Sequence, residues 1–84
     1  MAPIRRFDGT LQYLSDRAVL QTNGDRRVLV IDNPPTGFID KGDIAAAHTY
    51  FRDVLGAQEG DSVRVTGIAG TMGPMSFLQV IRLS

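Results

Sequence analysis

The chain has 84 residues, too few to build two hydrophobic cores, so we expect a single domain over residues 1–84. Hydrophobic residues make up 43% of the sequence, which is ordinary for a packed domain and too high for a disordered chain. Nine basic residues balance nine acidic ones, and this zero net charge excludes a strongly basic nucleic-acid binder. Cysteine is absent, which excludes a disulfide framework, a thiolate zinc site and thiol catalysis.

No segment has the pattern of a signal peptide or a membrane span. The longest apolar run is Val28 to Ile31, whereas a membrane-spanning helix needs about 20 apolar residues. The arginines at positions 5 and 6 are not followed by the apolar stretch that a signal peptide requires. We therefore expect a cytoplasmic protein with no membrane partner, although a processed secreted chain would show the same pattern.

The first part of the chain predicts a meander of three antiparallel strands. Residues 5–14 alternate between apolar or glycine positions and polar ones, which is typical of a half-buried strand. Asn23-Gly24 separates two further apolar runs, at 18–21 and 26–31. This dipeptide favours a type I′ hairpin turn, in which both central residues have positive φ. The positions on the buried face of the first strand are Phe7, Gly9, Leu11 and Tyr13.

A helix is expected after the prolines of residues 33–37 end the meander. Asp40 or Asp43 can cap its N-terminus, and Gly56 suits the position just after its last turn. The helix is about 12 residues long, or three turns. Its apolar stripe consists of Ile44, Ala47, His48, Phe51, Val54 and Leu55.

Two more strands are expected after the helix. Residues 62–67 alternate again, and residues 75–83 are nearly continuous in apolar side chains. Between them, residues 67–74 carry a glycine at every third position and predict a flexible connection. The order of elements is therefore β-β-β-α-β-β, which favours a closed or nearly closed barrel with the helix covering one end.

This order and several short motifs resemble the OB-fold, a five-stranded Greek-key barrel that binds oligonucleotides or oligosaccharides. The run from 59 to 67 is similar to the Gly-Asp-x-Val-x-Val-x-Gly stretch that begins the fourth strand of many OB-fold domains. The resemblance covers nearly the whole chain and identifies no particular family within the fold. An SH3-like barrel is the alternative, but it lacks a helix of this length in this place. The motifs are Phe7-x-Gly9-x-Leu11, Asn23-Gly24, Glu59 to Gly67 and Leu78-x-Val80.

Catalysis, a metal site and a cofactor site are not expected. His48 is the only histidine, and its place within the apolar stripe of the helix favours a packed residue at the edge of the core. The aspartates near the helix start favour capping over acid–base chemistry, and no tight set of metal ligands is present. We therefore expect a binding protein and not an enzyme.

The charges are distributed unevenly along the chain. Residues 1–27 hold five arginines against three aspartates, residues 28–63 hold two basic against six acidic residues, and residues 64–84 hold two arginines and no acid. The strands thus carry positive charge, and the helix with its flanking loops carries negative charge. Chance fluctuation in so short a chain is the alternative explanation.

The leading hypothesis is weak, salt-sensitive binding of single-stranded nucleic acid, with basic residues on phosphates and an aromatic ring stacking on a base. In OB-folds, the loop between strands four and five and the loop between strands one and two flank the binding face. The resemblance therefore implies ligand contacts from the first of these loops and from residues 15–17, which form the second and make it very short. The alternative is a protein-interaction module in which the apolar last strand, residues 75–83, pairs edge to edge with a partner. The candidate nucleic-acid-binding residues are Arg17, Arg26, Arg27, Arg64, Tyr13, Phe77, Thr71 and Met72.

Overall fold

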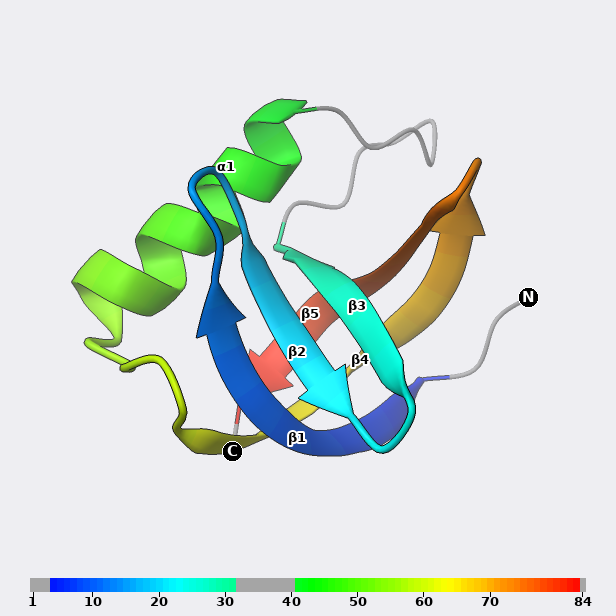
Figure 1. Ribbon diagram of the computed structural model, residues 1–84, viewed down its shortest axis with the longest axis horizontal. Helices are drawn as coiled ribbons and strands as arrows, with labels where there is room; N and C mark the ends of the chain where they lie inside the picture. The colour runs from blue at the N-terminus through cyan, green and yellow to red at the C-terminus, as the bar shows by residue number, and fades with distance from the viewer. Residues whose placement is uncertain (1–3, 32–40, 84) are drawn as a thin grey trace.

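The computed structural model describes residues 4–31 and 41–83. It is mainly β, with one helix between the third and fourth strands, so the predicted fold class is confirmed. Neither helical segment in the described ranges is long and apolar enough to cross a membrane. The elements are β1 (Arg5–Tyr13), β2 (Ala18–Thr22), β3 (Asp25–Val30), α1 (Lys41–Thr49), the π-helical turn η1 (Tyr50–Val54), β4 (Ser62–Met72) and β5 (Met75–Leu83), shown in Figure 1.

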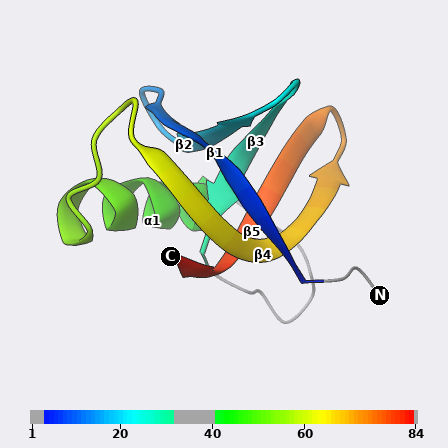
Figure 2. The same ribbon diagram turned by 90° about the horizontal axis from the view of Figure 1, so that it is seen from below.

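The five strands form a closed barrel in the order β1-β2-β3-β5-β4, with β4 pairing back onto β1. All neighbouring strands are antiparallel except β3 and β5, which run parallel through Val28↔Phe77 and Val30↔Gln79. This topology is compatible with an OB-like barrel. Figure 2 shows α1 lying along one end of the barrel, away from the N-terminal half of β1.

The main core fills the barrel and is closed at one end by the helix. Ala47 and Phe51 project from the helical segment into this core, and both are fully buried. The alternation predicted for β1 is confirmed, because Leu11 is buried and Phe7 and Tyr13 pack against the same cluster. The fully buried strand residues are Leu11, Ala18, Leu20, Leu29, Val65 and Leu78, so every strand contributes at least one.

A second, smaller cluster lies on the outer side of β3. Val28 and Val30 alternate with the inward-facing Leu29 and therefore face away from the main core. Ile44 of α1 packs with them, so the helix both closes the barrel and overlaps its outer wall. Partly buried side chains of β4 and β5 complete this cluster: Met72, Met75 and Phe77.

The helix matches its prediction at the start and differs at the end. Asp43 lies in the first turn of α1 and is buried, which places its negative charge at the start of the helix, while Asp40 and the prolines lie outside the described residues. Val54 is 68% exposed and Leu55 is 39% exposed, so their predicted place on the buried stripe is wrong. The last turn extends past the barrel wall, where no strand lies beneath it (Figure 1). Gly56, with φ of +65°, ends the helix as predicted.

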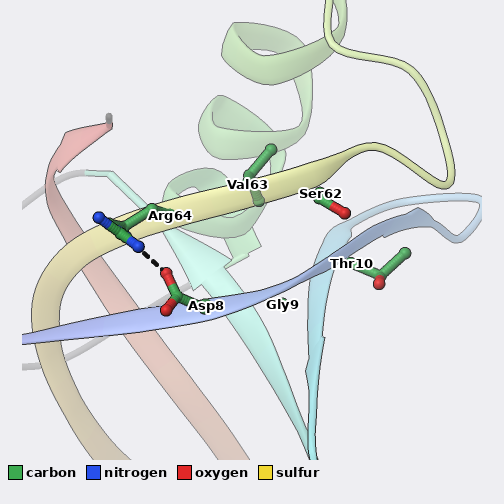
Figure 3. Close-up of a pocket in the computed structure, with 6 residues that line it drawn as sticks. All are labelled: Asp8, Gly9, Thr10, Ser62, Val63 and Arg64. Carbon is green, nitrogen blue, oxygen red and sulfur yellow. Dashed lines mark hydrogen bonds and ion pairs between the residues drawn. The ribbon is translucent and has the colours of Figure 1, made fainter.

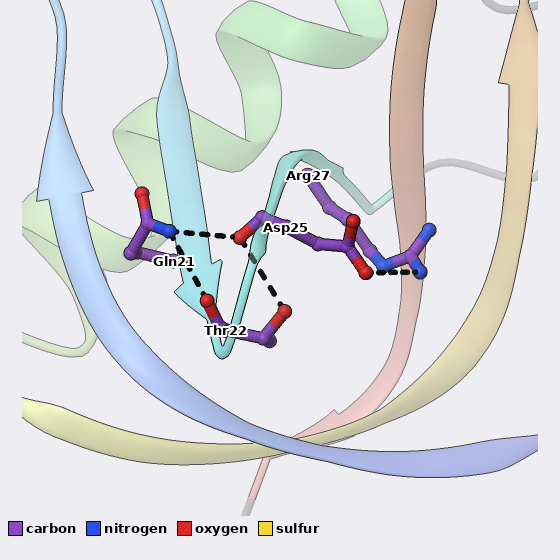
Figure 4. Close-up of polar contacts among 4 residues, drawn as sticks. All are labelled: Gln21, Thr22, Asp25 and Arg27. Carbon is purple, nitrogen blue, oxygen red and sulfur yellow. Dashed lines mark hydrogen bonds and ion pairs between the residues drawn. The ribbon is translucent and has the colours of Figure 1, made fainter.

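The β2–β3 hairpin is confirmed, but its turn type is not. Only Gly24 has positive φ (+89°), and Asn23 does not. This is the pattern of a type II turn, which needs positive φ only at its second central residue. Side chains beside the turn stabilise it: the Gln21 amide donates to the carbonyls of Thr22 and Asp25, and the Thr22 hydroxyl donates to that of Asp25 (Figure 4).

The expected flexible connection at 67–74 is wrong over most of its length. β4 continues to Met72 and pairs with β5 up to Met72↔Met75, so only Gly73 and Pro74 form the turn. Glycine occurs in loops, but it also occurs in strands at places where another chain segment approaches closely. The spacing of glycines in the sequence does not distinguish these two cases, so it led to the wrong prediction here.

Two of these glycines are required by close packing between β4 and β5. A Cβ on Gly67 would lie 2.1 Å from the backbone oxygen of Gln79, a contact that no side chain can make. A Cβ on Gly70 would lie 2.6 Å from the far edge of the Phe77 ring, which crosses from the neighbouring strand and covers Gly70. The glycines thus let the two strands meet in register.

We predict that Gly67→Ala lowers the free energy of unfolding by about 1–3 kcal/mol, because the new methyl group forces the two strands apart. Gly70→Ala should cost less, since a ring can rotate where a backbone carbonyl cannot. Gly42→Ala, at an exposed position in α1, is the control and should be neutral or stabilising. Urea denaturation of the three variants measures these changes, and equal stability of Gly67→Ala and wild type would contradict the packing argument.

Candidate nucleic-acid interface

The structure does not bring the eight predicted binding residues into one site. Arg17 and Tyr13 lie at the end of the barrel covered by α1, and Arg64 lies on the wall formed by β1 and β4. The other five lie toward the β2–β3 and β4–β5 turns: Arg26, Arg27, Thr71, Met72 and Phe77.

Tyr13 has a structural role. Its hydroxyl donates a 2.6 Å hydrogen bond to the carbonyl oxygen of Ala57, and its ring lies 5.5 Å from that of His48. Its backbone N–H donates to the Glu59 carboxylate. Burial raises the pKa of the phenol above its ordinary 10.0, and the negative charge of Asp61 adds to this rise. The ring therefore joins β1 to the chain segment after the helix and is not a free surface for stacking.

His48 is a half-buried residue at the edge of the core, as predicted, with its ring against Tyr13. No group of three His, Asp or Glu residues able to hold a metal ion occurs in the ranges 4–31 and 41–83.

Three of the four predicted arginines pair with a carboxylate. Arg17 binds its neighbour Asp16 through two hydrogen bonds, of 2.9 and 3.0 Å, and this contact lowers the pKa of the Asp16 carboxyl. The Nε of Arg64 donates to Asp8 at 2.7 Å across the β1–β4 seam. Both pairs are exposed, where such contacts add little to stability.

The Arg64–Asp8 pair borders a shallow pocket on the outer wall of the barrel (Figure 3). Gly9 lies at its centre without a side chain, and Thr10 and Ser62 form its other end. The two opposite charges neutralise each other at its rim, so the pocket offers hydroxyl groups but little net charge for a ligand.

Arg27 faces the barrel interior, and its side chain is only partly exposed. It pairs in register with the core residue Leu20, and its guanidinium lies 3.5 Å from the Asp25 carboxylate (Figure 4). The guanidinium carbons of Arg27 and Arg5 both lie 5.4 Å from the centre of the Phe7 ring. Such cation–π contacts hold guanidinium groups at the end of the barrel opposite α1.

Arg26 and Phe77 are the predicted residues that remain suited to contact a ligand. Arg26 alternates with the inward-facing Arg27, so it projects outward from β3, and it is exposed. Phe77 lies on the outer face of the adjacent β5, where it pairs with Val28, two residues after Arg26 on β3, and it is half-buried. Met72 packs beside Phe77 within the second cluster, and Thr71 is exposed at the end of β4.

The backbone of β5 is not a free edge at its centre. Phe77, Leu78 and Gln79 pair with β3 on one side and with β4 on the other. Edge-to-edge pairing with a partner, the alternative considered from the sequence, therefore has no open ladder at these three residues.

The distribution of charge follows the fold. The described strands and their turns, 4–31 and 62–83, hold seven arginines against three aspartates. Each aspartate forms an ion pair with one arginine: Asp8 with Arg64, Asp16 with Arg17 and Asp25 with Arg27. Four arginines are left exposed and without a carboxylate partner among the described residues: Arg5, Arg6, Arg26 and Arg82.

Three of these four arginines were not among the predicted site residues. Asp16 and Asp25 lie within two residues of the arginines they bind, so proximity in sequence could have marked Arg17 and Arg27 as paired. No sequence signal pairs Asp8 with Arg64, which are 56 residues apart. Comparison with protein-family models, with curated proteins and with solved structures finds no match for this chain.

We predict that Tyr13→Phe lowers the free energy of unfolding by about 1 kcal/mol, because the Ala57 carbonyl loses its donor. Since the folded-state pKa of Tyr13 lies above 10.0, its contribution to stability is present below pH 10 and is lost as the pH rises beyond it. Tyr13→Phe has no phenol to ionise, so its free energy of unfolding should fall less than that of wild type between neutral and alkaline pH. Chemical denaturation at neutral and alkaline pH measures both effects. A variant as stable as wild type at neutral pH would contradict the structural role of the hydroxyl.

Proposed function

We propose that this domain is a non-catalytic binding module of the OB-fold type that binds single-stranded nucleic acid weakly and in a salt-sensitive manner. The observation that carries the proposal is the set of four exposed arginines on the barrel that form no ion pair with a carboxylate among the described residues. Exposed guanidinium groups bind phosphate oxygens well, because their planar fork matches the geometry of the anion.

The wall formed by β3 and β5 combines one of these arginines, Arg26, with an apolar element. Arg26 projects from the same face of β3 as Val28, two residues further on, and Val28 pairs in register with the half-buried Phe77. A base can stack on an aromatic face while a neighbouring guanidinium contacts its phosphate. In OB-folds, the neighbouring β4–β5 loop flanks the binding face, and here Thr71 and Met72 lie at its base.

The acidic part of the domain lies on another side and limits the affinity. Residues 41–61, comprising α1, η1 and the loop to β4, hold two basic against four acidic residues. A strand of nucleic acid is repelled there and attracted to the barrel wall. Because the net charge of the chain is zero, we expect few phosphate contacts, in the order of three or four, and correspondingly weak binding.

Fluorescence anisotropy with a labelled oligothymidylate tests the proposal. With three or four phosphate contacts, the logarithm of the association constant should fall with the logarithm of the salt concentration with a slope of about −2 to −3. Arg26→Gln should weaken binding and reduce the slope by about 0.7, the share of one phosphate contact to a single strand.

Arg52→Gln is the matched control, since it removes the same charge from the exposed Arg52–Asp53 pair on η1. It should leave the salt slope unchanged. Absence of saturable binding at low salt would overturn the proposed function, and equal effects of the two substitutions would overturn the assignment to the β3–β5 wall.

A further inference from the structure

A row of three residues crosses the wall formed by β1, β4 and β5, which shares β5 with the wall that carries Arg26 and Phe77. Arg6 of β1 pairs in register with Thr66 of β4, and Thr66 pairs with Arg82 of β5. Val65, which directly precedes Thr66 on β4, is fully buried in the core. Because successive side chains of a strand point to opposite faces, Thr66 and the row lie on the outer face of the barrel. Two guanidinium side chains therefore flank one threonine, with their Cβ atoms about 10 Å apart.

An irregularity in β5 creates this row. Gly67 pairs with Val80, while the preceding residue Thr66 pairs with Arg82, so Ile81 is an extra residue on β5. Val80 and Leu83 both pack against the core, although residues three apart in a regular strand face opposite sides. Without the extra residue, Arg82 would face the interior.

The hydroxyl of Thr66 is unusual for a residue on an outer wall. Thr66 is only 8% exposed, and its Oγ1 is buried and makes no hydrogen bond in the described part of the chain. Buried hydroxyl groups nearly always have a partner, so an unpaired one between two arginines indicates a missing acceptor. Arg6 and Arg82 are themselves exposed and, within residues 4–31 and 41–83, form no ion pair.

The surroundings of Thr66 are mainly basic or apolar. Two positions away on the same face of β4 lie Arg64 and Ile68. The carboxylate nearest in register is that of Asp8, and it is occupied by the Nε of Arg64 at 2.7 Å. Within residues 4–31 and 41–83, two cations and one hydroxyl donor therefore have no anion bound to them.

We propose that Arg6, Thr66 and Arg82 form an anion site that holds one phosphate group. The guanidinium groups swing over the row to bind its oxygens, and the Thr66 hydroxyl donates a hydrogen bond to it. Oxyanions are the acceptors that match this donor set, because charge-assisted hydrogen bonds from Arg are strong and bidentate. The site does not require the proposed function: the phosphate group belongs either to a free phosphate or to the backbone of a nucleic acid.

Titration of the ¹⁵N-labelled domain with inorganic phosphate at constant ionic strength tests the site. We expect saturable shifts of the Thr66, Gly67 and Arg82 amides, with a dissociation constant in the millimolar range. Arg82→Gln should weaken binding by roughly threefold or more, as expected for loss of one exposed charge contact. Arg26→Gln, which removes the same charge from the other wall, should have no effect. Equal weakening by these two substitutions, or the absence of saturable shifts, would overturn the site.

Thr66→Val gives the sharpest test, because it removes the hydroxyl and keeps the shape of the side chain. Since the hydroxyl has no hydrogen-bond partner among residues 4–31 and 41–83, the variant should be as stable as wild type or more stable, yet bind phosphate more weakly. Thr66→Ser should retain binding. If Thr66→Val binds phosphate as wild type does, the proposed donor is wrong.

The oligothymidylate titration separates the two sources of phosphate. If the wild-type domain binds inorganic phosphate and Arg82→Gln reduces the salt slope of oligothymidylate binding, the site binds the phosphate groups of a nucleic-acid backbone. Phosphate binding without any oligonucleotide binding supports a free-phosphate site and overturns the proposed function alone. Oligonucleotide binding without a phosphate response at Thr66 overturns the anion site alone.

Discussion

The parallel pairing of β3 with β5 closes the barrel, and the wall that carries Arg26 and Phe77 depends on it. Only Val28, Leu29 and Val30 take part on the β3 side, so three register positions join the first half of the chain to its last strand. Without them the sheet would have two open edges, at β3 and β5, and its core would be exposed. The same pairing places Phe77 beside Val28, which brings an aromatic ring of the last strand to the wall that carries Arg26.

Regular patterns in the sequence predict the regular parts of this fold. Alternation in β1 and the apolar stripe around Phe51 determine which faces are buried, and the order of the elements follows from them. The errors arise where a contact distant in sequence decides the outcome. Gly70 has the appearance of a loop residue until Phe77 is known to cover it, and Leu55 appears buried until the barrel wall is known to end before it.

The candidate site was harder to predict than the fold, because an arginine can bind a ligand only if no acid already occupies it. Arg64 and Arg82 look alike in sequence, yet one lies against Asp8 and the other has no carboxylate among the described residues. The register of β1 with β4 decides this difference. The extra residue Ile81 likewise decides that the Arg82 side chain points outward. A sequence pattern cannot reveal such an extra residue, because Ile81 lies in a nearly continuous run of apolar residues. Segment charges showed that the strands are basic, but not which arginines are available.

The place of β5 in the barrel has a consequence for how the chain folds. β5 lies between β3 and β4, although it is the last of the five strands along the chain. On the ribosome, the β1–β2–β3 hairpins can form early from local contacts, but neither β3 nor β4 can complete its ladder until residues 75–83 emerge. Contacts between distant segments slow folding, so the nascent domain passes through a stage in which two strand edges and an apolar interior are exposed. We therefore expect the barrel to close only when β5 becomes available to pair with β3 and β4, and not when the core residues before it are synthesised.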